Sequence, residues 1–421
     1  MPHDAASAQA PDLPPPAALK QSLRRAERRK RFGAFLLTLP LLAYLSVLFV
    51  IPLVGMVWLS VSNTTVPTYM PATVKVLKDW RPTALPGDAA YTAVVTDLRS
   101  DFKAHKFGLV AKRLNEELPG TYGVIVKTTL RTAHMSPKQN WKQVLDTIDP
   151  AWGQIEIWRL LKRESSPVTA DFYLAALDLQ YGPHGQIEQV PSYERIYINL
   201  FIRTAWMSAF VTLLTLLLGY PLAYWISRMP ERKANLIMIA VLLPFWTSLL
   251  VRITAWIVLL QAHGVVNSIL VATHIVSPEH RPQLIFNAFG TIIVMTQVLL
   301  PFMVLPLYSV MRGIPDGYMR AAISLGAHPW SAFWKVFAPL TKSGVSAGVL
   351  LVFILAVGYY ITPELVGGQT GQFISNRIAY NVQHSLNWGL AAALGTLLTA
   401  VTLILFSVFN YLAGDSGISF G

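Results

Sequence analysis

The residue types that usually carry enzyme chemistry are either missing from this sequence or scattered along it. The 421-residue chain has no cysteine, which removes disulfides, thiolate metal ligands and thiol nucleophiles. Its nine histidines show no metal-ligand spacing, so we expect neither a metal site nor a cofactor. It also lacks a Gly-x4-Gly-Lys-Ser/Thr phosphate loop, a His-Glu-x2-His pair and a Gly-x-Ser-x-Gly elbow. The sequence therefore predicts that the chain is not an enzyme and that any ATP hydrolysis belongs to another chain.

A few charged and aromatic side chains within or beside long apolar stretches are the next candidates for chemistry. Arg252 lies within one stretch and Glu364 just beyond another. A charge in hydrocarbon costs about 2.5–3.5 kcal/mol on insertion scales, so both must face protein or water. The aromatic faces of Trp246, Trp256 and Trp388 suit a cation, although such residues near an interface more often anchor a protein in the membrane. These five residues are the candidate lining of a translocation path, with burial against a carboxylate or a helix end as the alternative for Arg252.

The composition places these residues in a membrane protein. Hydrophobic residues make up 53% of the chain, charged residues only 13%, and the mean hydropathy is +0.45. The net charge of +12 does not indicate nucleic-acid binding, because the basic residues concentrate in short segments beside apolar ones, as the positive-inside bias requires. We therefore expect the lipid bilayer, and no nucleic acid, among the partners of the chain.

Six apolar stretches are long enough to cross a bilayer, which takes about 20 residues. They cover residues 33–61, 199–227, 234–260, 288–311, 344–362 and 389–412. The turn at 228–233 and the loop at 312–343 are both basic, which predicts a cytosolic position for each. Counting spans from these loops places both chain ends in the cytosol. The sequence thus predicts an all-α membrane protein with six transmembrane helices.

The segments outside the spans differ from one another in character. Residues 1–32 are a basic tail that we expect in the cytosol, disordered at first and then helical, and residues 416–421 are a second cytosolic tail. Residues 62–197 carry charges of both signs and have apolar residues at helical spacing. They predict a mainly helical domain of about 130 residues, inserted after the first span on the periplasmic side. Docking of a binding protein, contact with a second subunit and structural elaboration are all open for this insert.

The basic loop at 312–343 is unusually rich in aromatic residues. Within it, residues 318–340 predict two short helices, because Gly326 can end the first in the left-handed conformation and Pro329 suits the start of the second. Five large apolar side chains would lie on these helices, namely Leu325, Trp330, Phe333, Trp334 and Phe337. That is more apolar surface than a solvated loop needs, so it either packs beneath the membrane helices or binds a partner.

The same segment resembles the EAA loop of ABC importer permeases, whose pattern is Glu-Ala-Ala, three residues, Gly, nine residues, Ile, one residue, Leu-Pro. In that family the loop is a coupling helix that sits in a groove of the ATPase subunit. The resemblance implies an ATPase-coupling site made of Arg320, Ala321, Ala322, Gly326, Ala327, Val336 and Pro339. Arg320 stands where Glu is usual, and Ala338 where Leu is usual. We therefore expect an acidic residue on the partner ATPase that compensates for Arg320.

Three further stretches, at 244–252, 361–368 and 387–393, resemble the PotB-like permeases of the spermidine/putrescine type. With the loop, the resemblance covers about residues 198–415 and the first helix, but not the insert. It implies a six-helix type I ABC importer permease bundle in the bacterial inner membrane, which moves a small polar solute, a polyamine or a related amino compound, into the cytosol. The implied partners are ABC ATPase subunits, a second, PotC-like permease subunit and a periplasmic solute-binding protein.

Two other functions fit parts of the sequence. A secondary transporter or channel that works alone should carry ionisable relays in several spans or a recognisable inverted repeat, whereas charges within the spans are nearly absent here. A membrane-anchored scaffold would explain the insert. It would leave the coupling-like loop without a purpose.

Overall fold

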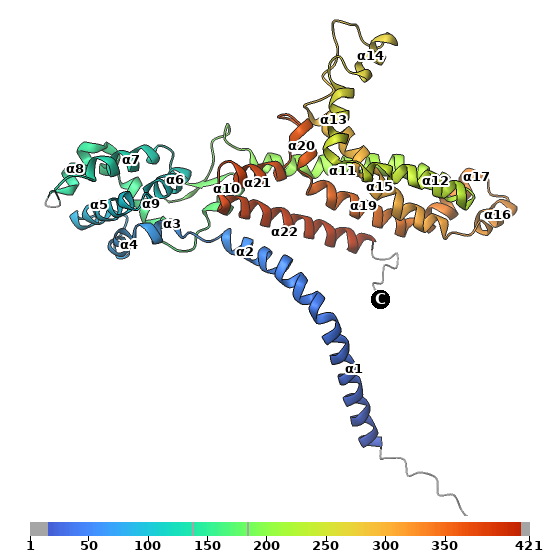
Figure 1. Cartoon of the computed structure of the whole chain (residues 1–421), viewed down its shortest axis with the longest axis horizontal. Helices are drawn as coiled ribbons and strands as arrows, with labels where there is room; N and C mark the ends of the chain where they lie inside the picture. The colour runs from blue at the N-terminus through green and yellow to red at the C-terminus, as the bar shows by residue number, and fades with distance from the viewer. Residues whose placement is uncertain (1–15, 137–138, 183–184, 414–421) are drawn as a thin grey trace, which may run out of the picture. The chain divides into compact units, whose positions relative to one another are not determined.

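The computed structural model describes residues 16–136, 139–182 and 185–413, with side chains between residues 29 and 411, so the predictions for residues 1–15 and 416–421 lie outside the described residues. The described chain is almost entirely helical (Figure 1) and divides into two units, Met1–Trp58 and Leu59–Gly421. It has five helices that are long and apolar enough to cross a membrane, or six if one bent pair of helices is counted as a single span. The predicted all-α membrane fold is therefore confirmed.

The first unit is a single long helix. It runs through α1 (Pro16–Leu45), a π-helical turn η1 (Ser46–Val50) and α2 (Ile51–Leu59). Its apolar part, Arg29–Leu59, has a mean hydropathy of 2.5, and its side chains are exposed along the whole length. A helix that is apolar all round requires lipid or other helices around it. This segment is therefore long and apolar enough to cross a bilayer.

Residues 62–197, the insert, contain most of the short helices. These are α3 (Thr65–Tyr69), α4 (Pro71–Leu77), α5 (Asp88–Lys103), α6 (Phe107–Glu117), α7 (Thr121–Thr132), α8 (Trp141–Ile148), η2 (Pro150–Gly153), α9 (Ile155–Glu164) and α10 (Asp171–Ala176). A small antiparallel hairpin, β1 (Leu179–Tyr181) and β2 (Ile187–Gln189), follows them. Helices α3 to α9 each bury one face on a shared core, in which Tyr91, Trp152 and Trp158 are completely buried. The rings of Tyr91 and Trp158 meet edge to face at 4.6 Å.

The membrane part of the second unit is built around α11 (Tyr197–Ser227), α15 (Ala288–Arg312) and α19 (Lys342–Val357), which lie side by side (Figure 1). Their facing side chains form one apolar core that includes Met207, Met303 and Val352. Close approach depends on glycine, since a Cβ at Gly348 would lie 2.7 Å from the sulfur of Met303. Small residues are the usual means by which helices pack closely in a membrane.

The third predicted span, 234–260, is divided in the structure. Helix α12 (Glu231–Leu242) is followed by a 3-10 turn, η3 (Leu243–Trp246), and then by α13 (Leu249–Leu260) and α14 (Val265–Ala272). Pro244 has no N–H to continue the helix, and Thr247 is extended at φ −98° and ψ 146°, so α12 ends here. The segment long and apolar enough to cross a membrane is therefore Leu249–Ala272 rather than 234–260.

The fifth predicted span, 344–362, also differs from the structure. Before it lie α16 (Gly317–Ser324), α17 (Pro329–Ala332), a π-helical turn η4 (Phe333–Phe337) and α18 (Ala338–Leu340). The helical stretch Pro329–Leu340 meets α19 at a bend of 63°. Helix α19 ends at Val357, before Gly358. Helices α20 (Ile361–Val366), α21 (Ile374–Gln383) and α22 (Trp388–Ala413) complete the described chain.

The insert is joined to the membrane helices by a polar cap and by an aromatic side chain. The carboxylate of Asp178 accepts hydrogen bonds from the backbone N–H groups of residues 196–198, at 3.1, 3.1 and 2.8 Å, which satisfies the free donors at the start of α11. Phe172 of α10 packs against Ile374 and Leu390. Its ring occupies the space that a Cβ at Gly389 would need, at 2.3 Å. The insert therefore rests on the first turn of α22.

Candidate functional site

The aromatic loop forms the expected pair of short helices. We use the name coupling hairpin for residues 317–340, which comprise α16, α17, η4 and α18. Gly326 has φ +91°, a left-handed conformation that ends α16 at low cost for glycine. Pro329 occupies the first turn of α17, and the ring nitrogen Nδ1 of His328 accepts a hydrogen bond from the backbone N–H of Trp330 at 3.3 Å. Two local signals therefore fix the turn between the helices.

The hairpin has two apolar faces with different surroundings. On the inner face, Phe337 is buried, and the ring of Phe333 lies 5.3 Å from that of Tyr224 on α11. On the outer face, Leu325 is 89% exposed, Trp330 67% and Trp334 56%. The packing interpretation therefore holds for the inner face. The outer face is uncovered in the part of the chain that the structure describes, and its binding of a partner stays a prediction.

The residues implied by the EAA resemblance lie on or beside this outer face. Arg320, Ala321, Gly326 and Pro339 are exposed, whereas Ala322, Ala327 and Val336 are half-buried. Small side chains at such positions let another molecule approach the helix backbone. Within the ranges that the structure describes, no carboxylate forms an ion pair with Arg320.

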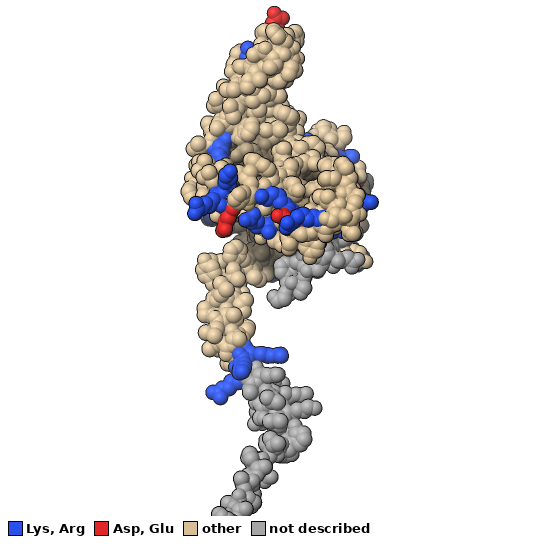
Figure 2. All heavy atoms as spheres, turned by 90° about the vertical axis from the view of Figure 1, so that its right-hand side faces the viewer, with Lys and Arg blue, Asp and Glu red and all other residues tan. Residues whose placement is uncertain are grey.

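Basic side chains gather at the same end of the bundle. Figure 2 shows Lys and Arg concentrated on this face with few acidic side chains among them. The segments that contribute them are the turn at 228–233 and the loop at 312–342, with Arg228, Arg232, Lys233, Arg312, Arg320, Lys335 and Lys342. A protein surface that covers this end must therefore supply negative charge.

The candidate path residues fall into two groups. Arg252 and Trp256 lie one turn apart on α13, and the indole N–H of Trp256 donates to Oε1 of Gln297 on α15 at 3.3 Å. Helix α13 also packs against α20, where Glu364 accepts a hydrogen bond from Asn376 at 2.7 Å. These three residues therefore lie on neighbouring elements. Trp246 in η3 and Trp388 at the start of α22 are exposed and lie on other elements, so the structure does not bring all five together.

Polar side chains on α21 were missed by sequence reasoning. Asn381 on this helix has a buried amide nitrogen without a hydrogen-bond acceptor among the described atoms, as Arg252 on α13 has two buried nitrogens, Nε and Nη1, without one. Arg377 and Asn381 are one helical turn apart on α21, and that polar spacing was the signal in the sequence.

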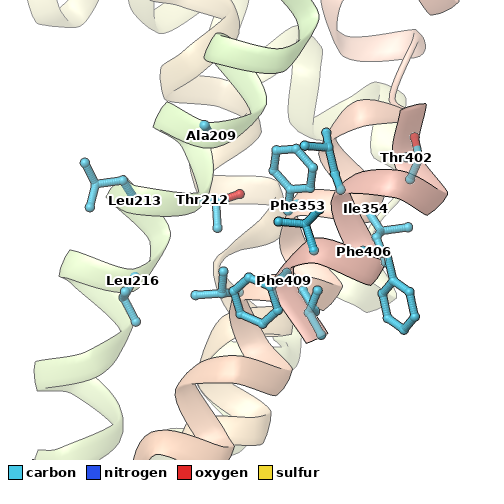
Figure 3. A pocket seen from close by; sticks show the side chains of 13 residues that line it. Ala209, Thr212, Leu213, Leu216, Phe353, Ile354, Thr402, Phe406 and Phe409 are labelled. Atoms are coloured by element: carbon cyan, nitrogen blue, oxygen red, sulfur yellow. The ribbon is translucent and has the colours of Figure 1, made fainter. Parts of the chain in front are cut away.

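An apolar groove of about 420 Å³ opens between α11, α19 and α22 (Figure 3). Its lining includes two polar side chains, Thr212 and Thr402. Each hydroxyl donates its proton to a carbonyl of its own helix, at 2.7 Å, so neither can donate to a ligand. Such a groove suits lipid or another apolar helix. Its lining contains no charged side chain, which makes Arg252, Trp256 and Glu364 the better candidates for the path.

A charged cluster in the insert was not foreseen from the sequence, because its members are far apart along the chain. Arg113 contacts Glu117 at 2.9 Å, Glu164 at 3.0 Å and Asp171 at 3.5 Å, and Arg163 contacts Glu117 and Asp171 at 3.3 and 3.4 Å. Burial and the neighbouring Asp171 raise the pKa of Glu164 to about 9. The three carboxyl groups are spaced closely enough for a metal ion, but Glu164 keeps its proton at neutral pH and two guanidinium groups balance the two remaining carboxylates. The cluster therefore acts as a link between α6, α9 and α10.

Comparison with known proteins assigns relatives to the second half of the chain. Residues 215–415 match the sequence profile of the family described as "Binding-protein-dependent transport system inner membrane component". The chain is similar to the spermidine/putrescine transport system permease protein PotB of Haemophilus influenzae, with 33% identity over 224 residues that cover 52% of this chain and 78% of that protein.

Two proteins of Escherichia coli are similar to the same extent. PotB of that organism is 31% identical over 214 residues, which cover 51% of this chain and 77% of PotB. The inner membrane ABC transporter permease protein YdcU is 32% identical over 222 residues, which cover 50% of this chain and 70% of YdcU. Among solved structures, a bacterial ABC transporter involved in the import of the acidic polysaccharide alginate is similar at a TM-score of 0.42 and 18% identity, over 51% of this chain and 79% of that one.

Proposed function

This chain belongs to the family of binding-protein-dependent transport system inner membrane components, and on that premise we propose that its coupling hairpin is the contact for a separate ATPase. It is a multi-pass permease subunit of an ABC importer in the inner membrane, and ATP is hydrolysed in another subunit. Membership also implies a periplasmic binding protein as a partner.

The observation that carries the ATPase contact is the uncovered outer face of the hairpin. Leu325, Trp330 and Trp334 expose large apolar side chains to solvent, which a cytosolic segment avoids unless a partner covers it. Tryptophan is also the residue type most enriched at the energetic centre of protein interfaces. We assign the contact to these side chains together with Arg320, Ala321, Ala322, Gly326, Ala327, Val336 and Pro339.

The two ends of α11 support a proposed orientation of the chain in the membrane. The insert caps its N-terminus through Asp178, and the hairpin packs on Tyr224 near its C-terminus. A helix of 31 residues is about 46 Å long, enough to place these ends on opposite sides of a bilayer. Because the hairpin end is basic, we place it and both chain termini in the cytosol and the insert, 62–197, in the periplasm.

The proposed solute is a polyamine or a related amino compound. Support comes from the PotB relatives, which are spermidine/putrescine permeases at 31–33% identity. In the candidate path, Glu364 and the ring of Trp256 suit an ammonium group, whereas Arg252 suits a carboxylate. A compound that carries both kinds of group would use all three side chains. Trp246 and Trp388 remain proposed lining residues that lie on other elements.

The proposed second permease subunit, of the PotC-like kind, has a candidate surface on α13 and α14. Leu250, Val251 and Ile269 are among the exposed apolar side chains on these helices. Lipid alone can cover them, so exposure by itself does not identify a neighbour. Pairing with a related subunit would cover the same side chains and would enclose the face of α13 that carries Arg252 and Trp256.

The experiment that tests the ATPase contact compares two tryptophans that are equally exposed. Trp334 on the hairpin and Trp225 on α11 are both 56% exposed. The transporter carrying Trp334→Ala should copurify with less of its cognate ATPase subunit, whereas Trp225→Ala should copurify with the wild-type amount. Undiminished ATPase with Trp334→Ala would remove the hairpin from the interface. Uptake of labelled putrescine into proteoliposomes, in competition with amino acids, tests the solute separately.

A further inference from the structure

The coupling hairpin is held by α11 as well as by the helices that precede and follow it in the chain. The ring of Tyr224 lies 5.3 Å from that of Phe333 and 5.0 Å from that of Phe337. One turn earlier on α11, the hydroxyl of Tyr220 shares a hydrogen bond with that of Thr341 at 3.0 Å. Two tyrosines at the cytosolic end of α11 therefore contact the hairpin and the residue that directly follows it.

Arg228, the residue directly after α11, binds three different parts of this arrangement. Its guanidinium lies 4.7 Å from the ring of Phe337 in the hairpin and 5.4 Å from the ring of Tyr224 on α11. It also forms an ion pair with Asp316, the residue directly before α16. A planar guanidinium can stack on aromatic faces while its N–H groups bind a carboxylate, which a lysine ammonium cannot do equally well.

A second arginine, from α15, binds the turn that follows α11. Arg312, the last residue of α15, donates from Nη1 to the carbonyl oxygens of Ser227 at 2.9 Å and Met229 at 2.8 Å. These carbonyls belong to the C-terminal end of α11, where backbone acceptors lack partners within the helix and a cation is favoured. The turn after α11 is thus held by Arg228 from within and by Arg312 from α15.

We infer that Arg228 is a positioning residue that fixes the coupling hairpin onto α11, so that a displacement of the hairpin moves α11 with it. The inference rests on the proposed function, because it takes the ATPase contact as the source of that displacement. Helix α11 packs along α15 and α19, and Asp178 of the insert caps its far end. The motion would therefore reach the periplasmic side through α11, in addition to the direct connections from the hairpin to α15 and α19.

The same basic turn provides a matched control. Arg232 lies four residues after Arg228, is exposed, and has neither an ion pair nor a ring contact within the part of the chain that the structure describes. A general effect of positive charge at this end should appear at both residues. A positioning effect should appear only at Arg228.

The test uses the complete transporter, reconstituted in proteoliposomes with its ATPase, second permease and binding protein. In Arg228→Gln, the amount of bound ATPase and the rate of ATP hydrolysis should stay near wild type. The amount of solute imported per ATP should fall about five-fold or more. Five-fold is the lower limit of the effect that coupling between two sites usually has. Import per ATP in Arg228→Lys should lie between the values for wild type and Arg228→Gln, and Arg232→Gln should match wild type. Wild-type import per ATP in Arg228→Gln would overturn the inference.

A second variant guards against misfolding of the first. Asp316→Asn removes the ion pair at an exposed carboxylate and leaves the edge-to-face contact between Tyr224 and Phe337 in place. It should reduce import per ATP by a smaller factor than Arg228→Gln, about two-fold, in the range of a surface ion pair. If neither variant changes import per ATP, Arg228 does not position the hairpin.

A measurement on the permease alone separates this inference from the proposed function. The chain has no cysteine, so spin labels at Glu231→Cys and Lys335→Cys report the distance between the turn after α11 and the hairpin. Adding Arg228→Gln should broaden that distance distribution, and Arg232→Gln should not. An unchanged distribution overturns the inference even if the ATPase contact holds. If the distribution broadens in Arg228→Gln but the wild-type permease does not bind the ATPase, the proposed function is refuted and the positioning role of Arg228 is not.

Discussion

The insert and the coupling hairpin both carry large aromatic side chains, but they use them in opposite ways. In the insert, Trp152, Trp158 and Tyr91 are completely buried against one another. In the hairpin, Trp330 and Trp334 also meet edge to face, at 5.9 Å, yet both are more than half exposed. The insert therefore completes its own core. The hairpin has a core on one side only, and another molecule must complete the other.

Charged side chains show the same difference. Arg113 in the insert is buried, is balanced by Glu117 and Asp171, and also contacts the carboxyl group of Glu164. Arg320 in the hairpin is exposed and has no carboxylate partner among the residues that the structure describes. The insert supplies its own counter-charges, whereas on our proposal a partner supplies the counter-charge for Arg320. Substitutions should therefore affect stability in the insert and assembly in the hairpin.

The largest expected effect is on the core of the insert. Trp158→Ala should lower the free energy of unfolding of the insert by about 3–5 kcal/mol, because it leaves a large cavity in a closely packed core. Thermal unfolding or pulse proteolysis of the detergent-purified permease measures this loss. Trp334→Ala in the hairpin should change stability by no more than about 0.5 kcal/mol. Equal losses for both would mean that the hairpin is also a self-contained core.

Reversal of the charge at Arg320 tests whether a partner supplies the counter-charge that the hairpin lacks. Arg320→Glu should weaken binding of the cognate ATPase about tenfold, because an acidic residue on the partner would then meet a like charge. Titration of the purified ATPase onto the permease in nanodiscs measures the affinity. Arg232→Glu, a reversal elsewhere at the basic end, is the control and should have little effect. Full affinity in Arg320→Glu would exclude a compensating acid.

The contact between the insert and α22 gives a prediction with an effect of intermediate size. A Cβ at Gly389 would lie 2.3 Å from the ring of Phe172, so Gly389→Ala should destabilise this contact by about 1–3 kcal/mol. Faster proteolytic release of the insert is the readout. Phe172→Leu in the same chain should restore part of the loss. Gly123→Ala, on the open face of α7 with nothing within 4 Å, should not accelerate release.

The smallest expected effect is a dependence of insert stability on pH. Burial raises the pKa of Glu164 to about 9 and that of Asp101 to about 6. Both carboxyls bind a proton more tightly when folded, so their contribution to stability is present at low pH and is lost as pH rises through those values. The lowered pKa of Asp171 has the opposite sign, but it acts below the ordinary range for aspartate, outside this window.

From pH 6 to pH 9, the free energy of unfolding of the insert should therefore fall by at least about 1 kcal/mol. Urea unfolding monitored through the buried tryptophans measures it across that range. Glu164→Gln should flatten the pH dependence, since the amide cannot ionise. A stability that rises with pH in the wild type would contradict the assignment of a proton to Glu164.

The sequence predicted the parts of the molecule that local signals determine. The turn of the hairpin depends on Gly326 and Pro329, and the structure has the left-handed glycine and the helix start at those positions. The membrane character of the chain follows from apolar length. Where the sequence stretch was uniformly apolar, as in 234–260, its length alone could not show that Pro244 and an extended Thr247 divide the helix.

The parts that the sequence did not predict depend on contacts between distant residues. Glu117, Glu164 and Asp171 meet Arg113 only because α6, α9 and α10 pack together. In the same way, the candidate path residues were chosen by type and by depth in an apolar stretch. That choice cannot tell Trp256, which packs toward α15, from Trp388, which is exposed at the start of α22.

The central prediction is that the hairpin lies in the cytosol and the insert in the periplasm. Two single-cysteine variants of this cysteine-free chain, Lys335→Cys in the hairpin and Lys127→Cys in the insert, place an exposed thiol on each. A membrane-impermeant maleimide applied to spheroplasts should label the variant at 127 and not the one at 335, with the opposite result in inverted vesicles. Labelling of both from the same side would contradict this orientation and, with it, the assignment of the hairpin to a cytosolic ATPase.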